Sequence, residues 1–112
     1  MIMDYVFVDN LAQTLDIPTD GILSRTTYEH EHFKVITFGF DAGQELSEHT
    51  ASVPAILYIV QGEATLTLGE DTKPAQAGTW VEMPAHLPHA VLAHTPLVML
   101  LIMAKRISEN GA

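Results

Sequence analysis

GTWVEMPAHLPHAVLA, residues 78–93, is the stretch on which the fold prediction rests. A glycine turn leads into a short apolar strand, and a loop between Pro84 and Pro88 leads into a second strand that begins at His89. Because side chains alternate between the two faces of a strand, we expect His89 to point into the space that the strands enclose. The sequence therefore predicts a functional site around His89.

The hydrophobic pattern also predicts strands for most of the remaining chain. After residue 21, apolar or alternating segments recur with glycine or proline turns about every 8–12 residues, which is typical of an all-β sandwich or barrel. FKVITFGF, residues 33–40, alternates most clearly. Residues 44–50 form a polar segment, and residues 73–76 connect two turns. The expected strands cover residues 22–28, 33–40, 55–60, 64–68, 79–83, 89–94 and 97–104, with a short edge strand over residues 3–8.

The N-terminal region differs from the rest of the chain. Asp9 or Asn10 can cap one helical turn that carries Leu11 and Leu15, and Pro18 ends this turn. The 112 residues fit one domain with a single core. We divide this domain into an N-terminal segment (1–21), a barrel (22–104) and a polar tail (105–112).

The composition argues against several classes of function. A formal net charge of −9 disfavours nucleic acid, because binding to phosphates needs a basic surface. No apolar run approaches the roughly 20 residues of a membrane helix, and the N-terminus lacks the basic region of a signal peptide. We therefore expect no membrane partner and a cytoplasmic location. Without cysteine, a metal site would have to use His, Asp, Glu or Gln.

Two glycine-to-histidine segments resemble the two motifs of the cupin family. In the first segment, five residues separate the glycine from the histidine, and a second glycine stands at the closing position. In the second segment, a proline follows the glycine after five residues and a histidine follows the proline after four. The matching residues are Gly43, His49 and Gly62, and then Gly78, Pro84 and His89. The resemblance covers residues 22–104 and implies a cupin-type jelly-roll barrel.

The two motifs also depart from the family pattern. Cupins usually hold a divalent metal with three histidines and a glutamate, and only His49 and His89 match that set. Alanine stands at the other two ligand positions, Ala51 and Ala55, while the loop glycine is replaced by His86 and the final asparagine by Ala93. No cofactor is therefore certain. The resemblance implies that the cofactor, if there is one, is a divalent metal such as Fe, Mn, Ni or Zn.

Strand parity predicts the lining of a pocket. If His49 faces inward, then every second residue after it does so too, and these residues are apolar. The same parity applies after His89, and we expect Phe38 or Phe40 to join the lining. The predicted pocket consists of His49, Ala51, Ala55, Leu57, Met83, His89 and Val91.

Other polar residues are weaker candidates. His86 is either a third metal ligand or an exposed loop histidine, and His94 should face away from the pocket. His49 and His89 could exchange protons near neutral pH, but no carboxylate stands at an inward position to orient them. His30 and His32 have the i, i+2 spacing of a metal chelate, but their charged surroundings favour a solvated hairpin. Glu45 and Glu48 could supply a carboxylate, and a polar loop explains them equally well.

Two functions remain open at this stage. The first is a small-molecule-binding cupin of unassigned activity, with a mostly apolar pocket that carries two histidines. The alternative is a metal-dependent oxygenase or isomerase that uses His49, His89 and His86. A structural dimer with a vestigial site is a third reading, and the sequence does not decide whether the protein is an enzyme. Apolar residues on both faces of residues 55–60 and 97–104 further predict a homodimer.

Overall fold

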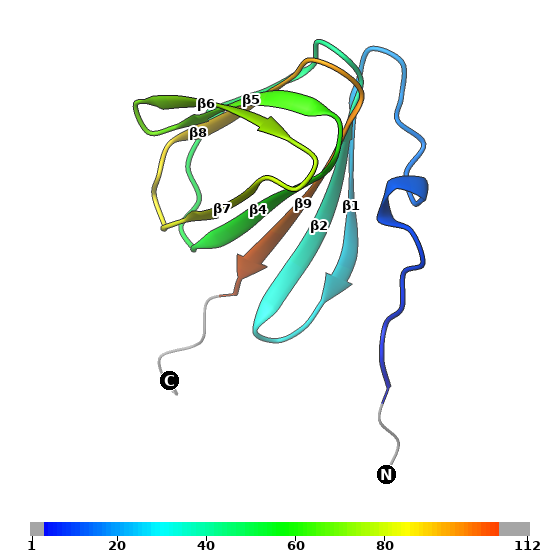
Figure 1. Cartoon of the computed structure of the whole chain (residues 1–112). Coiled ribbons are helices and arrows are strands. Elements are labelled where there is room, and N and C mark those ends of the chain that lie inside the picture. The colour runs from blue at the N-terminus through cyan, green and yellow to red at the C-terminus, as the bar shows by residue number, and fades with distance from the viewer. Residues whose placement is uncertain (1–3, 106–112) are drawn as a thin grey trace.

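The computed structural model describes residues 4–105 and consists almost entirely of antiparallel strands. Two sheets face each other and enclose the core (Figure 1). The predicted all-β jelly-roll fold with a short N-terminal helical turn is confirmed. No helix in this range is long and apolar enough to span a bilayer. The elements are η1 (Leu11–Gln13), β1 (Ile22–Glu29), β2 (Phe33–Phe40), β3 (Glu45–His49), β4 (Ala55–Gln61), β5 (Glu63–Leu68), β6 (Asp71–Gln76), β7 (Trp80–Met83), β8 (His89–Ala93) and β9 (Leu97–Ala104).

The strand pairings are nested within one another. A five-stranded sheet has the order β1-β2-β9-β4-β7, and a four-stranded sheet has the order β3-β8-β5-β6. Strand β2 pairs with β9, β3 with β8, β4 with β7 and β5 with β6. The chain therefore folds as one long hairpin that wraps around itself, and this wrapping brings the two glycine-to-histidine segments together as neighbours.

The core is built from alternate residues of both sheets. In β4, Leu57 and Ile59 are buried, whereas Tyr58 between them is exposed. In the opposite sheet, Leu66 of β5 and Val91 of β8 are buried in the same cluster. This alternation explains the apolar periodicity of the sequence, because one face of each sheet lies against the core.

Two strands form where the hydrophobic pattern did not predict them. β3 lies within the polar segment 44–50, and its burial pattern has one half-buried residue among exposed ones. β6 includes residues 73–76, and Ala75 is its one buried residue. Both strands occupy an edge of the four-stranded sheet. A strand at an edge can be held by backbone hydrogen bonds to one neighbour while most of its side chains stay in water, so its sequence carries little apolar signal.

The N-terminal segment has a different structure from the one expected. The edge strand predicted over residues 3–8 is wrong for residues 4–8, which are extended but pair with no strand. Residue 3 and residues 106–112, most of the predicted tail, lie outside the described range. The helical turn is η1, and the Asn10 side chain caps it by accepting a hydrogen bond from the Ala12 N–H at 3.0 Å.

The N-terminal segment crosses the outer surface of the five-stranded sheet at Gly39. A Cβ atom added to Gly39 would lie 2.8 Å from Ile17 Cγ1 and 3.2 Å from Leu15 Cδ1. Leu15 is 7% exposed. The glycine in FKVITFGF therefore makes room for this crossing, and one end of the sheet is covered by the chain itself.

Candidate functional site

The histidine of the second glycine-to-histidine segment is fixed by the backbone of the loop before it. The loop between β7 and β8 is tied to the chain beyond β3 by a 2.7 Å hydrogen bond from the His86 N–H to the Ala51 carbonyl. His86 has a φ of +71°, a left-handed conformation that favours glycine. This explains why the cupin motif has glycine at this position. The turn ends at His89, the first residue of β8.

The two motif histidines lie directly opposite each other. His49 is the last residue of β3 and pairs with His89 in the register of the four-stranded sheet. Their ring centroids are 4.3 Å apart, at an interplanar angle of 57°. His89 is 8% exposed, whereas His49 is exposed. The pair therefore connects the interior to solvent.

Both rings are oriented by the same kind of backbone contact. Nδ1 of His49 lies 2.8 Å from the Ser47 carbonyl oxygen, and Nδ1 of His89 lies 2.8 Å from the Leu87 carbonyl oxygen. A carbonyl oxygen only accepts hydrogen bonds, so each Nδ1 carries the hydrogen. In the neutral rings, each Nε2 is left with a lone pair that can accept a hydrogen bond or bind a cation.

The Nε2 atom of His89 reaches accessible space although its residue is buried. It makes no hydrogen bond to the described part of the chain, where His89 bonds through Nδ1 alone. No buried side-chain nitrogen or oxygen among residues 4–105 lacks a hydrogen-bond partner. Nε2 of His89 must therefore touch solvent-accessible space, as an atom of a binding site does.

The histidine pair lies at a mostly apolar cavity of about 280 Å³ between the two sheets. Apolar walls with a few converging polar atoms are typical of sites that bind small molecules. The histidines contribute the ring nitrogens, and the rest of the lining is mainly aliphatic. The lining residues are Ile36, Phe38, His49, Thr50, Ala51, Val53, Ala55, Met83, Pro84, His89, Leu101 and Met103.

The predicted pocket residues divide into two groups. His49, Ala51, Ala55, Met83 and His89 line the cavity. Leu57 and Val91 do not line it; they belong to the core, with 2% and 1% of their surface exposed. Alternation along the strands correctly assigned both residues to the inner face. The inner face extends beyond the cavity, however, and at these two positions the side chains pack against other core residues.

The sequence pointed to Phe38 of β2, which lines the cavity, but not to the other lining residues of β2 and β9. Ile36, Leu101 and Met103 all line the cavity. The alternation of β2 could have suggested Ile36, because it shares a face with Phe38. The segment LVMLLIMA of β9 is apolar at every position, so no periodicity shows which of its residues face inward.

The other polar candidates lie apart from the cavity. His86 is exposed and does not line it. His94 faces outward, and its Nε2 lies 2.6 Å from the Thr65 hydroxyl. His30 and His32 lie at the β1–β2 hairpin, with ring centroids 5.3 Å apart. Glu45 and Glu48 are exposed on β3.

The donor set does not fit the usual metal centre of this fold. Among residues 4–105, no three His, Cys, Asp or Glu side chains gather closely enough to hold a metal ion. Ala51 and Ala55 line the cavity beside the histidine pair with methyl groups and offer no donor atom. Two imidazoles leave most of a metal coordination sphere unfilled, so the residues present do not form a three-ligand site.

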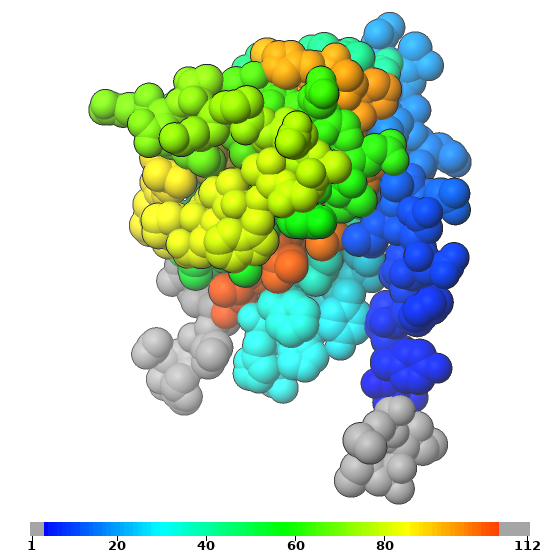
Figure 2. Space-filling view, in the orientation of Figure 1, coloured from blue at the N-terminus to red at the C-terminus, as the bar shows by residue number. Residues whose placement is uncertain are grey.

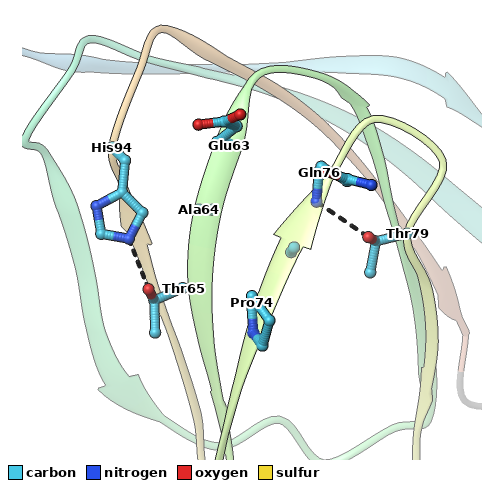
Figure 3. A pocket seen from close by; sticks show the side chains of 8 residues that line it. Glu63, Ala64, Thr65, Pro74, Gln76, Thr79 and His94 are labelled. Atoms are coloured by element: carbon cyan, nitrogen blue, oxygen red, sulfur yellow. Dashed lines mark hydrogen bonds between the residues drawn. The ribbon is translucent and has the colours of Figure 1, made fainter.

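A second hollow lies on the outer surface of the four-stranded sheet (Figure 3). It has a volume of about 440 Å³, and the side chains drawn around it include Glu63, Thr65, Gln76 and Thr79. This groove is more open and more polar than the cavity at the histidine pair. We therefore place the candidate site in the cavity, where apolar walls and two ring nitrogens meet.

Two facing sheets of nested antiparallel strands, with a histidine pair at an interior cavity, define a jelly-roll barrel. The chain belongs to the cupin family, whose profile, described as "Cupin domain", matches residues 36–103. No curated protein matches the chain.

Several solved structures are similar over most of their length. A conserved protein of unknown function from Streptococcus pyogenes is 31% identical, with a TM-score of 0.82 over 95% of this chain and 93% of that one. An RmlC-like cupin from Desulfovibrio desulfuricans is 27% identical, with a TM-score of 0.80 over 89% and 97%. A cupin superfamily protein from Desulfitobacterium hafniense is 24% identical, with a TM-score of 0.80 over 86% and 88%.

Proposed function

We propose that this cupin binds a small organic molecule in the cavity at His49 and His89. The observation that carries this proposal is the pair of rings whose Nδ1 atoms are held by backbone carbonyls, which leaves both Nε2 atoms for a ligand. The ligand has an apolar body that contacts the aliphatic walls. Its polar group is a hydrogen-bond donor, such as a hydroxyl or an N–H, because a neutral imidazole with hydrogen on Nδ1 accepts at Nε2.

The size of the cavity limits the ligand. Its volume of about 280 Å³ is at the lower end of the range of roughly 300–1,000 Å³ found for ligand pockets. A compact molecule with a short aliphatic chain or a single ring fits such a space. The exposed position of His49 provides the route of entry.

Binding can be tested with 1-hexanol as the probe, observed by NMR on the ring signals of the two histidines and the Met83 methyl group. We expect chemical-shift changes at these groups and none in Ala51→Leu, whose larger side chain fills the cavity. Ala90→Leu, on the opposite face of β8, is the matched control and should bind like the wild type. Equal binding by both variants would place the probe elsewhere and contradict the proposal.

The alternative is a metal-dependent oxygenase or isomerase that uses His49 and His89, with His86 as a third ligand. One observation favours it: metal-bound histidines usually donate the other ring N–H to a carbonyl or carboxylate, as both Nδ1 atoms do here. The exposed position of His86 and the alanines beside the pair count against it.

Metal analysis of protein purified without an affinity tag separates the two functions. Stoichiometric Fe, Mn, Ni or Zn that disappears in both His49→Ala and His89→Ala would overturn the metal-free binding site. If the metal also persisted in His86→Ala, the third-ligand role of His86 would be wrong. We expect no stoichiometric metal, because the chain supplies two donors where at least three are needed.

The outer surface of the five-stranded sheet further supports a homodimer. We define the outer apolar face as Ile56, Tyr58, Trp80, Leu100 and Ile102, which are half-buried or exposed. The register pairs Tyr58 with Trp80 and Leu100, and Ile56 with Ile102. A contiguous apolar surface of this kind is typical of a protein interface. The cytoplasmic location stays a prediction from the sequence.

A further inference from the structure

Two methionine side chains line the same cavity as the histidine pair. Met83 is the last residue of β7 and is 2% exposed, and Met103 near the end of β9 is half-buried. Both are paired with Ala55 of β4, which lies between them in the register of the five-stranded sheet. Cross-strand partners place their side chains on the same face of a sheet. Both thioethers therefore share the inner face with Ala55, which also lines the cavity.

The small side chain of Ala55 leaves room between the two methionines. The neighbouring strands on either side of it are roughly 4.8 Å away. A methionine side chain is unbranched and has three rotatable bonds, so it can lean over a neighbour as small as alanine. Ala55 also stands at one of the positions where the cupin motif has a metal ligand. The two thioethers thus flank a position that is a ligand in the motif and an alanine here.

The outer side of the sheet separates these methionines from bulk water. In Figure 2, the yellow region of β7 lies beside the orange-red end of β9, and their side chains form a continuous surface. Behind this surface, the walls of the cavity are mainly aliphatic. An ion in the cavity would therefore be held by side-chain donors in surroundings that contain little water.

The histidines and the methionines together form a soft set of donors. His49 and His89 each have Nε2 available, because backbone carbonyls hold both Nδ1 atoms. Met83 and Met103 each add a thioether sulfur, a soft ligand that selects Cu(I), and imidazole also binds copper well. Zinc in proteins is bound by Cys, His, Asp and Glu instead. For the divalent metals considered above, the cavity still offers two imidazoles, whereas for Cu(I) it offers four donors.

Charge also favours a monovalent ion in this cavity. The four donors are uncharged when the rings are neutral, and none of the described residues that line the cavity is a carboxylate. Removing an ion from water is costly, and in the Born description this cost grows with the square of the charge, so a divalent ion needs far more compensation. The formal net charge of −9 meanwhile attracts cations to the protein.

We propose that the cavity binds one cuprous ion through Nε2 of His49 and His89 and the sulfur atoms of Met83 and Met103. The ion enters and leaves as Cu(I), so no electron donor or acceptor takes part. This site adds a second class of ligand to the same cavity and does not depend on the organic molecule proposed above.

Competition with bicinchoninate, a chelator that forms a coloured complex with Cu(I), tests the proposal under anaerobic conditions. We expect the metal-free wild type to withdraw one Cu(I) per chain from the chelator. X-ray absorption of the copper-loaded protein should show both sulfur and nitrogen neighbours. Met83→Leu/Met103→Leu should lose at least tenfold in Cu(I) affinity together with the sulfur signal. Leucine is close to methionine in volume, so the variant should still fold.

Met99→Leu is the matched control, because Met99 is a buried methionine of β9 that does not line the cavity. It should bind Cu(I) like the wild type. A wild type that withdraws no Cu(I) from the chelator would overturn the proposal. Equal affinity in the wild type and Met83→Leu/Met103→Leu would also overturn it, since other residues would then hold the ion. Binding of 1-hexanol is measured on metal-free protein, so either ligand can fail without the other.

Discussion

The two sheets of the barrel have similar inner faces and different outer faces. Leu57 of the five-stranded sheet and Leu66 of the four-stranded sheet are buried to the same extent, at 2% and 1% exposed. On the outside, β4 presents Ile56 and Tyr58, whereas β5 presents Thr65 and Thr67. The comparison shows that the outer face of β5 is polar, as expected for a surface in water, and that the outer face of β4 is apolar.

The largest expected effects test the similarity of the inner faces. Leu57→Ala and Leu66→Ala should each lower the free energy of unfolding by about 2–5 kcal/mol, because each removes a buried side chain and leaves a cavity. Urea denaturation monitored by circular dichroism measures both. A loss below about 1 kcal/mol in one of them would mean that its sheet contributes less to the core than its burial indicates.

Two threonine hydrogen bonds of equal length test the difference between the outer faces. Thr37, fully buried on β2, lies 2.6 Å from the Thr27 hydroxyl. Thr65, on β5, lies 2.6 Å from His94 in an exposed position. Thr37→Val should cost about 1–2 kcal/mol, because the half-buried Thr27 hydroxyl loses its partner. Thr65→Val should cost less than about 0.5 kcal/mol, since water replaces the lost contact. Equal losses would contradict the difference in solvation.

Substitutions that exchange the polarity of the outer faces should have smaller effects. Ile56→Thr on β4 should weaken the free energy of association by about 1 kcal/mol, because it removes apolar surface from the interface. The melting temperature should then fall, and its dependence on protein concentration should weaken. Thr67→Val on β5 should leave the concentration dependence unchanged. Differential scanning fluorimetry over a hundredfold range of concentration measures this. If the melting temperature of Ile56→Thr depends on concentration as that of the wild type does, the interface lies on another surface.

The smallest effect is expected at the end of the five-stranded sheet. The Lys105 ammonium lies 2.9 Å from Glu29 Oε2 and, mainly through this hydrogen bond and then through its charge, lowers the pKa of Glu29. The folded-state pKa is therefore below the unfolded value, so the small stabilisation is present above the unfolded pKa and is lost as pH falls through the folded pKa.

Lys105→Ala should raise the pKa of Glu29, which an NMR titration of its side-chain carboxyl carbon follows. Stability should change little, because both side chains are partly exposed and surface pairs contribute little. An unchanged titration in the variant would show that the contact does not persist in solution.

The sequence predicted best those strands that have one apolar face toward the core and one polar face toward solvent. β2 alternates in sequence, and the loop before β8 has prolines at both ends, so the core face of β2 and the inward direction of His89 could be expected. β6 could not be found because Ala75 is its one buried residue. The extended segment 4–8 was mistaken for a strand because its apolar residues resemble one, while strand formation also needs a hydrogen-bonding neighbour that periodicity does not reveal.

The candidate site was predictable to a smaller degree. The resemblance to the cupin motifs paired His49 with His89, but their orientation depends on the Ser47 and Leu87 carbonyls, which no spacing indicates. The contribution of β9 was hidden by a segment that is apolar on both faces. Leu57 and Val91 were wrongly placed in the pocket, because alternation shows which face of a strand a residue is on but does not show how far the cavity extends along the strand.

The way in which the two rings are held has a consequence for the evolution of this barrel. Each imidazole is anchored to the backbone two residues before it, and no side chain of the cavity wall takes part. The wall residues Ala51, Ala55 and Met83 can therefore change without releasing the rings. A new ligand shape needs only new wall residues, so the same histidine pair can be kept while the specificity of the pocket diverges.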